Sequence, residues 1–303
     1  MQTLACTAPE IMLARIGAET THIRIGSGGI MLPHYTALKV AETFRMLHAL
    51  YPDRIDLGIG RAPGGGPIEA TALRRYRGAP AHALQVDDFP ELLSELLAYL
   101  HGAFGEDHPF SRILVEPSAP GSPDVWLLGS SLWSARAAAE YGLPYAFAHF
   151  FSPDPTGAAI TNYQRDFQPN PGLAEYGRSR PEATAAVGVI CAESQAEAER
   201  LFQSVRLLQL RIRINDRRPV ASPEEAASEL NRFGPQPAES GEFARYFVGT
   251  PDRVAASLRD MASKLGLGEL IVNTITHDHA ARLRSYTLLA EAVGLQRPIA
   301  DAA

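Results

Sequence analysis

The sequence predicts an α/β barrel built from parallel strands with helices packed outside them. Short apolar runs alternate along the chain with segments of helical period about 10–15 residues long, which is the pattern of βαβ crossovers. The runs VWLLG, YAFAHF and ELIVNT are apolar almost throughout, as expected for parallel strands covered by helices. A chain of 303 residues suits one barrel or two domains. No change in composition marks a second domain, so we expect a single domain over residues 1–303.

The first half of the chain predicts two strands and three helices. Pro9 suits the first position of a helix, because its missing N–H costs nothing there. A stripe of apolar residues at helical spacing predicts the second helix. The expected elements are a helix over residues 9–20, a strand over 23–28, a helix over 37–50, a strand over 55–60, a loop or broken helix over 62–77, and a helix over 89–100.

The second half predicts four strands, which brings the total to six strand-helix units. Gly142 is a natural C-terminal cap, and Thr250-Pro251-Asp252 is typical of a helix N-terminus. Residues 215–242 are polar and contain proline, so we expect a surface insertion there. The expected elements, after a turn-rich segment over 101–123, are strands over 125–129, 145–149, 185–191 and 269–275, and helices over 132–141, 156–167, 194–210, 250–265 and 280–292.

Composition excludes several classes of protein. The formal net charge of −6 argues against a dedicated nucleic-acid binder, which would carry a basic face. No apolar run reaches the roughly 20 residues that a membrane helix needs, and the N-terminus lacks the pattern of a secretory signal, so we expect a cytoplasmic protein. Cys6 and Cys191 lie far apart and are expected to be reduced thiols.

Six motifs occur together in one order: GSGGIMLP, LKVAETFRMLHALYPDRIDLGIGRAPG, WLLGSS, GLPYAFAHF, VGTPDRV and ARLRSYTLLAEA. In these motifs, which cover nearly the whole chain, the sequence resembles the bacterial luciferase-like monooxygenase family. The resemblance implies a TIM (β/α)8-type barrel that binds FMN, or in some branches F420, at its carboxyl face. It also implies that this chain begins inside the family's second barrel helix and lacks the first two strands. One of those strands carries the family's catalytic histidine.

Arg61 is the first predicted site residue. It follows a predicted strand directly, and the carboxyl ends of parallel strands are where such folds hold ligands. The guanidinium fork suits bidentate recognition of phosphate. By resemblance, Arg61 would contact the FMN phosphate. The alternative is an ordinary surface arginine.

Three serines and two glycines complete the predicted flavin site. Ser131 and Ser134 open the helix after strand 125–129, with Ser130 beside them, and a helix N-terminus binds phosphate well. The alternative role for these serines is N-capping, which can coexist with phosphate binding. Gly28 and Gly29 match the family position where a cis peptide lies under the flavin ring; a simple strand-end turn is the alternative.

The histidines give weaker signals. His149 and Phe150 end a predicted strand and are expected to face the pocket, with His149 a weak catalytic candidate; a structural histidine is an equal alternative. His34 is a polar group near the pocket without an assigned role. His277 and His279 flank Asp278, but no third ligand follows at metal spacing, so we expect Asp278 to cap the last helix and predict no metal site.

Two other functional motifs are not matched by this sequence. GIGRAPG departs from a dinucleotide fingerprint in the position of its third glycine, and Pro63 interrupts the helix start. No G-x-S-x-G elbow of a serine hydrolase occurs.

The resemblance therefore implies a flavin-dependent monooxygenase that uses reduced FMN and O2 on a small, largely apolar substrate. A separate flavin reductase would supply the cofactor, and the family forms homodimers through the helices that match residues 9–20 and 37–50. The alternatives are an F420-dependent reductase and a noncatalytic flavin-binding remnant.

Overall fold

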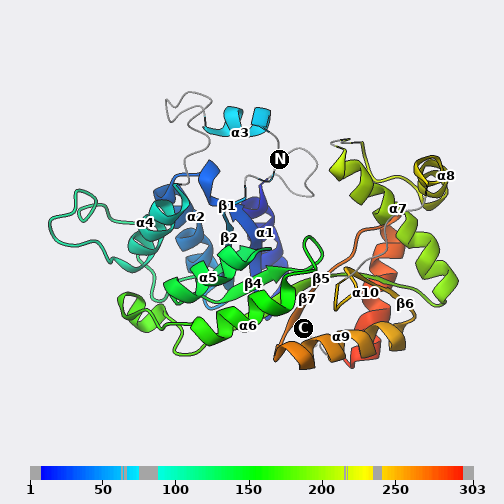
Figure 1. The fold of residues 1–303 in the computed structure, drawn as a ribbon. Coiled ribbons are helices and arrows are strands. Elements are labelled where there is room, and N and C mark those ends of the chain that lie inside the picture. The colour runs from blue at the N-terminus through cyan, green and yellow to red at the C-terminus, as the bar shows by residue number, and fades with distance from the viewer. Residues whose placement is uncertain are drawn as a thin grey trace. The chain divides into compact units, whose positions relative to one another are not determined.

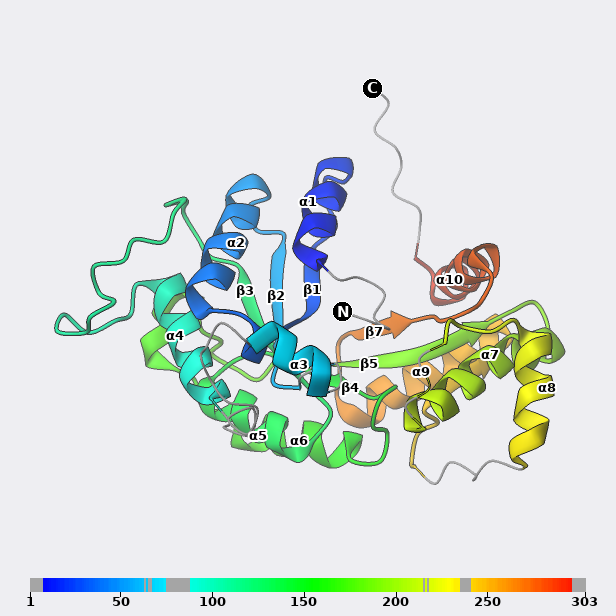
Figure 2. The same ribbon diagram turned by 90° about the horizontal axis from the view of Figure 1, so that it is seen from above.

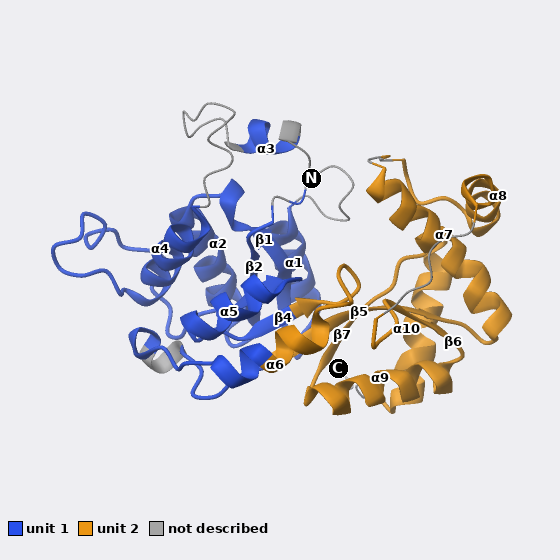
Figure 3. Ribbon diagram, in the orientation of Figure 1, with its two compact units in different colours: residues 1–146, 162–182 blue, residues 147–161, 183–303 orange. Residues whose placement is uncertain are grey.

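The computed structural model describes residues 8–62, 64, 67–74, 88–214, 216, 218–234 and 241–295. Helices alternate with strands along the chain (Figure 1), which confirms the predicted α/β class. The chain divides into two compact units, residues 1–146 with 162–182 and residues 147–161 with 183–303 (Figure 3). Within the described part of the chain, no helix is both long and apolar enough to cross a bilayer.

The first unit is built around consecutive strands that lie in sequence order. β1 (Ile25–Met31), β2 (Ile55–Gly60) and β3 (Asp124–Gly129) are parallel neighbours. β4 (Tyr145–Ala148), whose last two residues belong to the second unit, follows β3 in the sheet order. Figure 2 shows β1, β2 and β3 side by side, with α1 and α2 beside them. Its helices are α1 (Pro9–Glu19), η1 (Leu32–His34), α2 (Ala37–Leu50), α3 (Pro67–Arg74), α4 (Phe89–His101), α5 (Leu132–Tyr141) and η4 (Pro171–Tyr176), and α6 (Thr156–Asp166) crosses the boundary between the units.

Most of the apolar stripe predicted on α2 packs inward, but its last member, Leu50, is 56% exposed. Val40, Ala41, Phe44 and Leu47 are buried, and they recur at the three- and four-residue spacing of one helix face. α5 ends as predicted, because Gly142 takes a left-handed conformation with φ of 65° that other residues adopt at a cost.

Ion pairs fix the amino ends of the strands in the first unit. Arg24, just before β1, contacts Asp56 at the start of β2 and Asp124 at the start of β3, both at 2.6 Å. The indole N–H of Trp126 also donates to Asp56, at 3.2 Å. The hydrogen bond to Asp56 raises the pKa of Arg24. An ion-pair network of Arg24, Asp56 and Asp124 therefore occupies the amino end of this sheet.

The second unit is built around β5 (Ala183–Cys191). β5 pairs in parallel with β6 (Tyr246–Gly249) near its carboxyl end and with β7 (Leu270–Asn273) nearer its start. A regular barrel would pair its last two strands with each other, so the pairing of both with β5 departs from that pattern. The helices of this unit are α7 (Gln195–Arg213), α8 (Pro223–Phe233), α9 (Pro251–Leu265) and α10 (His279–Val293).

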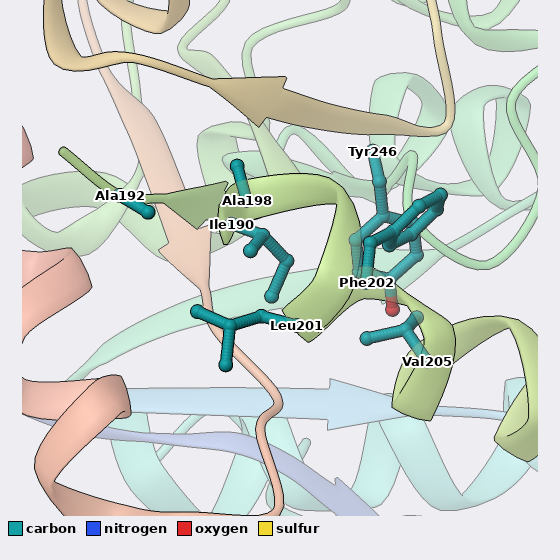
Figure 4. Close-up of a cluster of buried hydrophobic side chains, with 7 residues drawn as sticks. All are labelled: Ile190, Ala192, Ala198, Leu201, Phe202, Val205 and Tyr246. Atoms are coloured by element: carbon teal, nitrogen blue, oxygen red, sulfur yellow. The ribbon is translucent and has the colours of Figure 1, made fainter. Parts of the chain in front are cut away.

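An apolar cluster holds α7 against β5 and β6. Tyr246 packs against Phe202, with ring centroids 5.5 Å apart. Phe150, which was expected to face the pocket, packs against this cluster and is half-buried. The seven buried members are labelled in Figure 4: Ile190, Ala192, Ala198, Leu201, Phe202, Val205 and Tyr246.

Several details correct the predicted elements. The described residues contain seven strands, not six, because β6 was missed. The insertion expected over residues 215–242 contains the helix α8. The segment over 62–77, expected to be a loop or broken helix, contains the short helix α3, which is compatible with that expectation. Thr250 occupies the N-cap of α9 but makes no side-chain capping bond. Cys191 is a buried free thiol, and burial raises its pKa to about 11. Cys6 lies outside the described residues.

Candidate functional site

The carboxyl ends of β1, β2 and β3 meet at one edge of the first unit. Met31 of β1 is paired with Gly60 of β2, and Gly60 is paired with Leu128 of β3. The residues that follow these strands therefore emerge side by side. Arg61 follows β2 and Ser130 follows β3, so the structure brings the predicted phosphate-binding residues to the same edge. We call this edge the strand-end site; it comprises Gly28, Gly29, Arg61, Ser130, Ser131, Ser134 and Trp133.

The glycines of β1 differ in what surrounds them. The peptide bond between Gly28 and Gly29 is cis, and the register with β2 shifts between Gly28 and Ile30. A Cβ atom added at Gly29 would lie 2.5 Å from Leu128 and 2.6 Å from the carbonyl oxygen of Gly58. A Cβ atom added at Gly28 would meet no atom within 4 Å. Gly29 is therefore needed for close packing, whereas Gly28 borders open space that a flat ligand can approach.

Arg61 lies over an aromatic ring that sequence reasoning missed. Its guanidinium carbon is 3.7 Å from the centroid of Trp133, the second residue of α5. Trp133 in turn packs edge-on against Phe89 at 5.9 Å. Arg61 is exposed, while Phe89 is buried. A cation over an indole face is attracted by the ring quadrupole, so this contact fixes Arg61 beside the first turn of α5.

The serines of α5 form a capping box. The Ser131 hydroxyl accepts from the Ser134 N–H at 3.4 Å, and the Ser134 hydroxyl accepts from the Ser131 N–H at 3.3 Å. Ser134 is buried, lies 2.8 Å from the carbonyl oxygen of Ser131 and contacts the Tyr145 hydroxyl at 3.0 Å. Burial raises the pKa of Tyr145. Ser134 is thus committed to the helix start, while Ser130 and Ser131 are half-buried at the edge of the site.

His149 has the environment of a structural histidine. It is fully buried in the second unit, and its ring nitrogens contact the Thr156 hydroxyl at 2.8 Å and the Ala244 carbonyl oxygen at 2.9 Å. Phe243 and Phe247 pack against the ring. Of the two roles left open for His149, this geometry favours the structural one, because both nitrogens bind protein groups.

The remaining histidines lie elsewhere in the fold. Asp278 accepts from the Ala281 N–H at 2.8 Å and so caps α10, as predicted. His279 contacts Arg282 at 2.9 Å. His34 is buried in η1. Over the described ranges, no three histidine, cysteine or acidic side chains converge in a way that could hold a metal ion.

The second unit contains a cavity of about 430 Å³ at the first turns of α7, α8 and α10, which sequence reasoning did not predict. Two arginines line it, and carboxylates neutralise both. Arg200 pairs with Glu197 at 2.8 Å and with Glu224, and Arg284 pairs with Glu193 at 2.6 Å.

Residues 3–268 match the model of the luciferase-like monooxygenase family. The uncharacterized protein YwcH of Bacillus subtilis is 40% identical over 293 residues, covering 95% of this chain and 84% of that protein. The N-acetyl-S-alkylcysteine monooxygenase of the same organism is 31% identical over 290 residues, covering 96% of this chain and 84% of that protein.

Comparison with solved structures gives the same result. The structure of apo-MsnO8 has a TM-score of 0.84 and 46% identity, covering 97% of this chain and 84% of that one. The oxygenating constituent of 3,6-diketocamphane monooxygenase from Pseudomonas putida, solved with FMN, has a TM-score of 0.61 and 18% identity, covering 98% and 86%. The F420-dependent tetrahydromethanopterin reductase of Methanopyrus kandleri has a TM-score of 0.60 and 14% identity, covering 94% and 86%. The last two likenesses show a shared fold.

Proposed function

The chain belongs to the luciferase-like monooxygenase family, and we propose that it is a flavin-dependent monooxygenase that binds reduced FMN at the strand-end site. The observation that carries this proposal is the meeting of Arg61 with the first turn of α5 at the carboxyl ends of β2 and β3. A guanidinium beside a helix N-terminus is a favourable environment for a phosphate dianion, because both contribute positive charge and N–H donors.

The residues present fit a flavin mononucleotide. Arg61, Ser130 and Ser131 would hold the phosphate, and Gly28 would let the ring approach the backbone of β1, where a side chain would otherwise project. Ser134 and Tyr145 keep the start of α5 in place through their mutual hydrogen bond. When bound, reduced FMN supplies the electrons that activate dioxygen; the protein binds and orients it.

The phosphate anchor can be tested by comparing FMN with riboflavin, which lacks the phosphate. We expect Arg61→Ala to raise the Kd for reduced FMN about 10- to 100-fold, because charge-assisted hydrogen bonds are worth roughly 1.5–3 kcal/mol. The Kd for riboflavin should not change. Anaerobic ultrafiltration with each reduced flavin measures both values.

A matched control is Arg136→Ala, which removes an exposed arginine on the outer face of the same helix. That variant should bind FMN as the unmodified protein does. Equal affinity of the unmodified protein for FMN and riboflavin would contradict the anchor.

Monooxygenation can be separated from its alternatives by product analysis. With reduced FMN from an added flavin reductase, the protein should transfer one atom of isotopically labelled dioxygen to a small apolar thioether, aldehyde or ketone. FMN binding without labelled product would favour a noncatalytic flavin-binding protein. Preferential binding of F420 would favour a reductase, the activity named for one structure of the same fold.

We also propose that the protein forms a homodimer through α1 and α2. These neighbouring helices carry five exposed large apolar side chains: Ile11, Met12 and Ile16 on α1, and Met46 and Leu50 on α2. Such side chains gathered on adjacent helices are typical of an association surface. Sedimentation equilibrium should give twice the chain mass of 32.8 kDa, and a mass of one chain at micromolar concentration would contradict the dimer.

A further inference from the structure

The contact between Arg61 and Trp133 is the closest arginine–aromatic contact found within the described ranges of the chain. The other arginine-to-ring distances are 5.8 Å for Arg54 over Tyr51 and 5.0 Å for Arg206 over Phe202, against 3.7 Å here. At 3.7 Å the guanidinium carbon lies in van der Waals contact with the indole. This contact joins the residue after β2 to the first turn of α5.

Trp133 is itself held in place. Its indole packs at 69° to the ring of Phe89, the first residue of α4, which is 1% exposed. Trp133 also belongs to the first turn of α5, whose start is fixed by the capping box of Ser131 and Ser134. The indole is therefore a rigid surface attached to the same helix turn that presents its N–H groups.

We infer that Trp133 is a positioning residue for Arg61: the indole orients the guanidinium toward the cofactor's phosphate monoester at the start of α5. This inference rests on the proposed function. An arginine side chain loses about 2 kcal/mol of rotamer entropy when it is fixed, and a partner that fixes it beforehand removes part of that cost from binding. A ring face serves this purpose because it attracts the cation without contributing a formal negative charge that would repel phosphate.

A purely structural role predicts a different outcome. If Trp133 only fills space against Phe89, its replacement should change the stability of the first unit and leave the Kd for FMN unchanged. Two replacements separate these roles. Trp133→Leu keeps an apolar side chain but removes the ring face, whereas Trp133→Phe retains a smaller ring.

The deciding experiment is a double-mutant cycle on the Kd for reduced FMN, with riboflavin as the phosphate-free probe. From the range of cation–π strengths, we expect Trp133→Leu to weaken FMN about 3- to 30-fold and Trp133→Phe to weaken it less. Neither variant should change the Kd for riboflavin. In the Arg61→Ala background, Trp133→Leu should have no further effect on FMN, because the residue it positions is gone.

Three results would overturn the inference. Equal losses from Trp133→Leu with and without Arg61 would show that the two residues act independently. An equal loss of FMN and riboflavin affinity would show a general effect on the fold. If Trp133→Leu does not fold, Trp133→Phe carries the test, and an unchanged Kd for FMN in that variant would end the inference.

Different results test the proposed function and the role of Trp133. If the unmodified protein does not discriminate FMN from riboflavin, the phosphate site itself is absent. If it does discriminate, and Arg61→Ala removes the discrimination while the Trp133 variants do not reduce it, only the role of Trp133 is wrong.

Discussion

Two arginines, one in each unit, are held by different kinds of partner. In the first unit, Arg61 is exposed and lies on the face of an indole. In the second unit, Arg211 is 6% exposed; its Nη2 donates to Glu229 at 2.8 Å and its Nη1 to the Pro219 carbonyl oxygen at 2.9 Å. An arginine bound by carboxylates holds structure together, because its charge is already balanced. An arginine packed on a ring face is oriented by the ring quadrupole, which places no formal negative charge beside it.

The carboxylate network of the second unit extends beyond Arg211. Arg218 contacts Asp216 at 2.5 Å and Glu229 at 2.7 Å, and these contacts join the end of α7 to α8. The ion pairs in the cavity follow the same rule, since Arg200 and Arg284 both contact glutamates. The comparison shows two ways to fix an arginine side chain: carboxylates that balance its charge, as at Arg211, and a ring face that orients it, as at Arg61.

Two glycines of β2, next to the strand-end site, differ in how closely the neighbouring backbone approaches them. A Cβ atom at Gly58 would lie 2.0 Å from the carbonyl oxygen of Ser27, a backbone atom of β1 that cannot move aside. We expect Gly58→Ala to lower the free energy of unfolding by at least about 3 kcal/mol, because β1 and β2 must separate. Urea denaturation followed by circular dichroism measures this loss.

Gly60 is the matched control in the same strand. The nearest atom to a Cβ there is the Leu128 carbonyl oxygen at 3.8 Å, an ordinary contact. Gly60→Ala should therefore change the free energy of unfolding by no more than about 1 kcal/mol. If the two variants were equally stable, close approach of the β1 and β2 backbones would not be what these glycines provide.

Much of the first unit could be predicted from sequence because its signals are local. The apolar stripe of α2, the proline at the start of α1 and the glycine after α5 each act within one or two turns of their own element. The order of strand ends then followed from the rule that parallel strands place their carboxyl ends at one edge. That rule alone predicts that Arg61 and Ser131 lie at the same edge of the sheet.

The missed features divide into two kinds. α8 had a local signal, since Ser222 and Glu225 form a capping box and Pro223 stands at the helix start. β6 also had a local signal, the short apolar run YFVG, which is as long as β4 and β7, two strands that were predicted. Trp133 had no local signal, because its role depends on the register that sets β2 beside β3. The burial of His149 likewise depends on Ala244 and the rings of Phe243 and Phe247, far along the chain.

We also expect the two units to lose stability at different pH values. Burial lowers the pKa of His101, at the end of α4, from 6.5 to about 4, and the nearby charge of Arg45 adds to this effect. Because the folded state keeps this imidazole neutral while the unfolded chain protonates it, its contribution to stability is full above pH 6.5 and is lost between pH 6.5 and 4. The shift corresponds to a loss of up to about 3 kcal/mol.

The carboxylates of the second unit respond at lower pH. The hydrogen bond from Arg211 lowers the pKa of Glu229 below its ordinary 4.5, and that from Arg218 lowers the pKa of Asp216 below 3.8. Their contribution to stability is therefore present above those ordinary values and is lost only as the pH falls through the lowered ones.

Hydrogen exchange at pH 7 and pH 4.5, corrected for the intrinsic rate, should show α4 losing protection while α7 and α8 keep theirs. His101→Gln should reduce the loss in α4, and His22→Gln, at an exposed position, should leave it unchanged. Equal loss of protection in α4 and α8 would mean that acid acts on the chain as a whole and not through this imidazole.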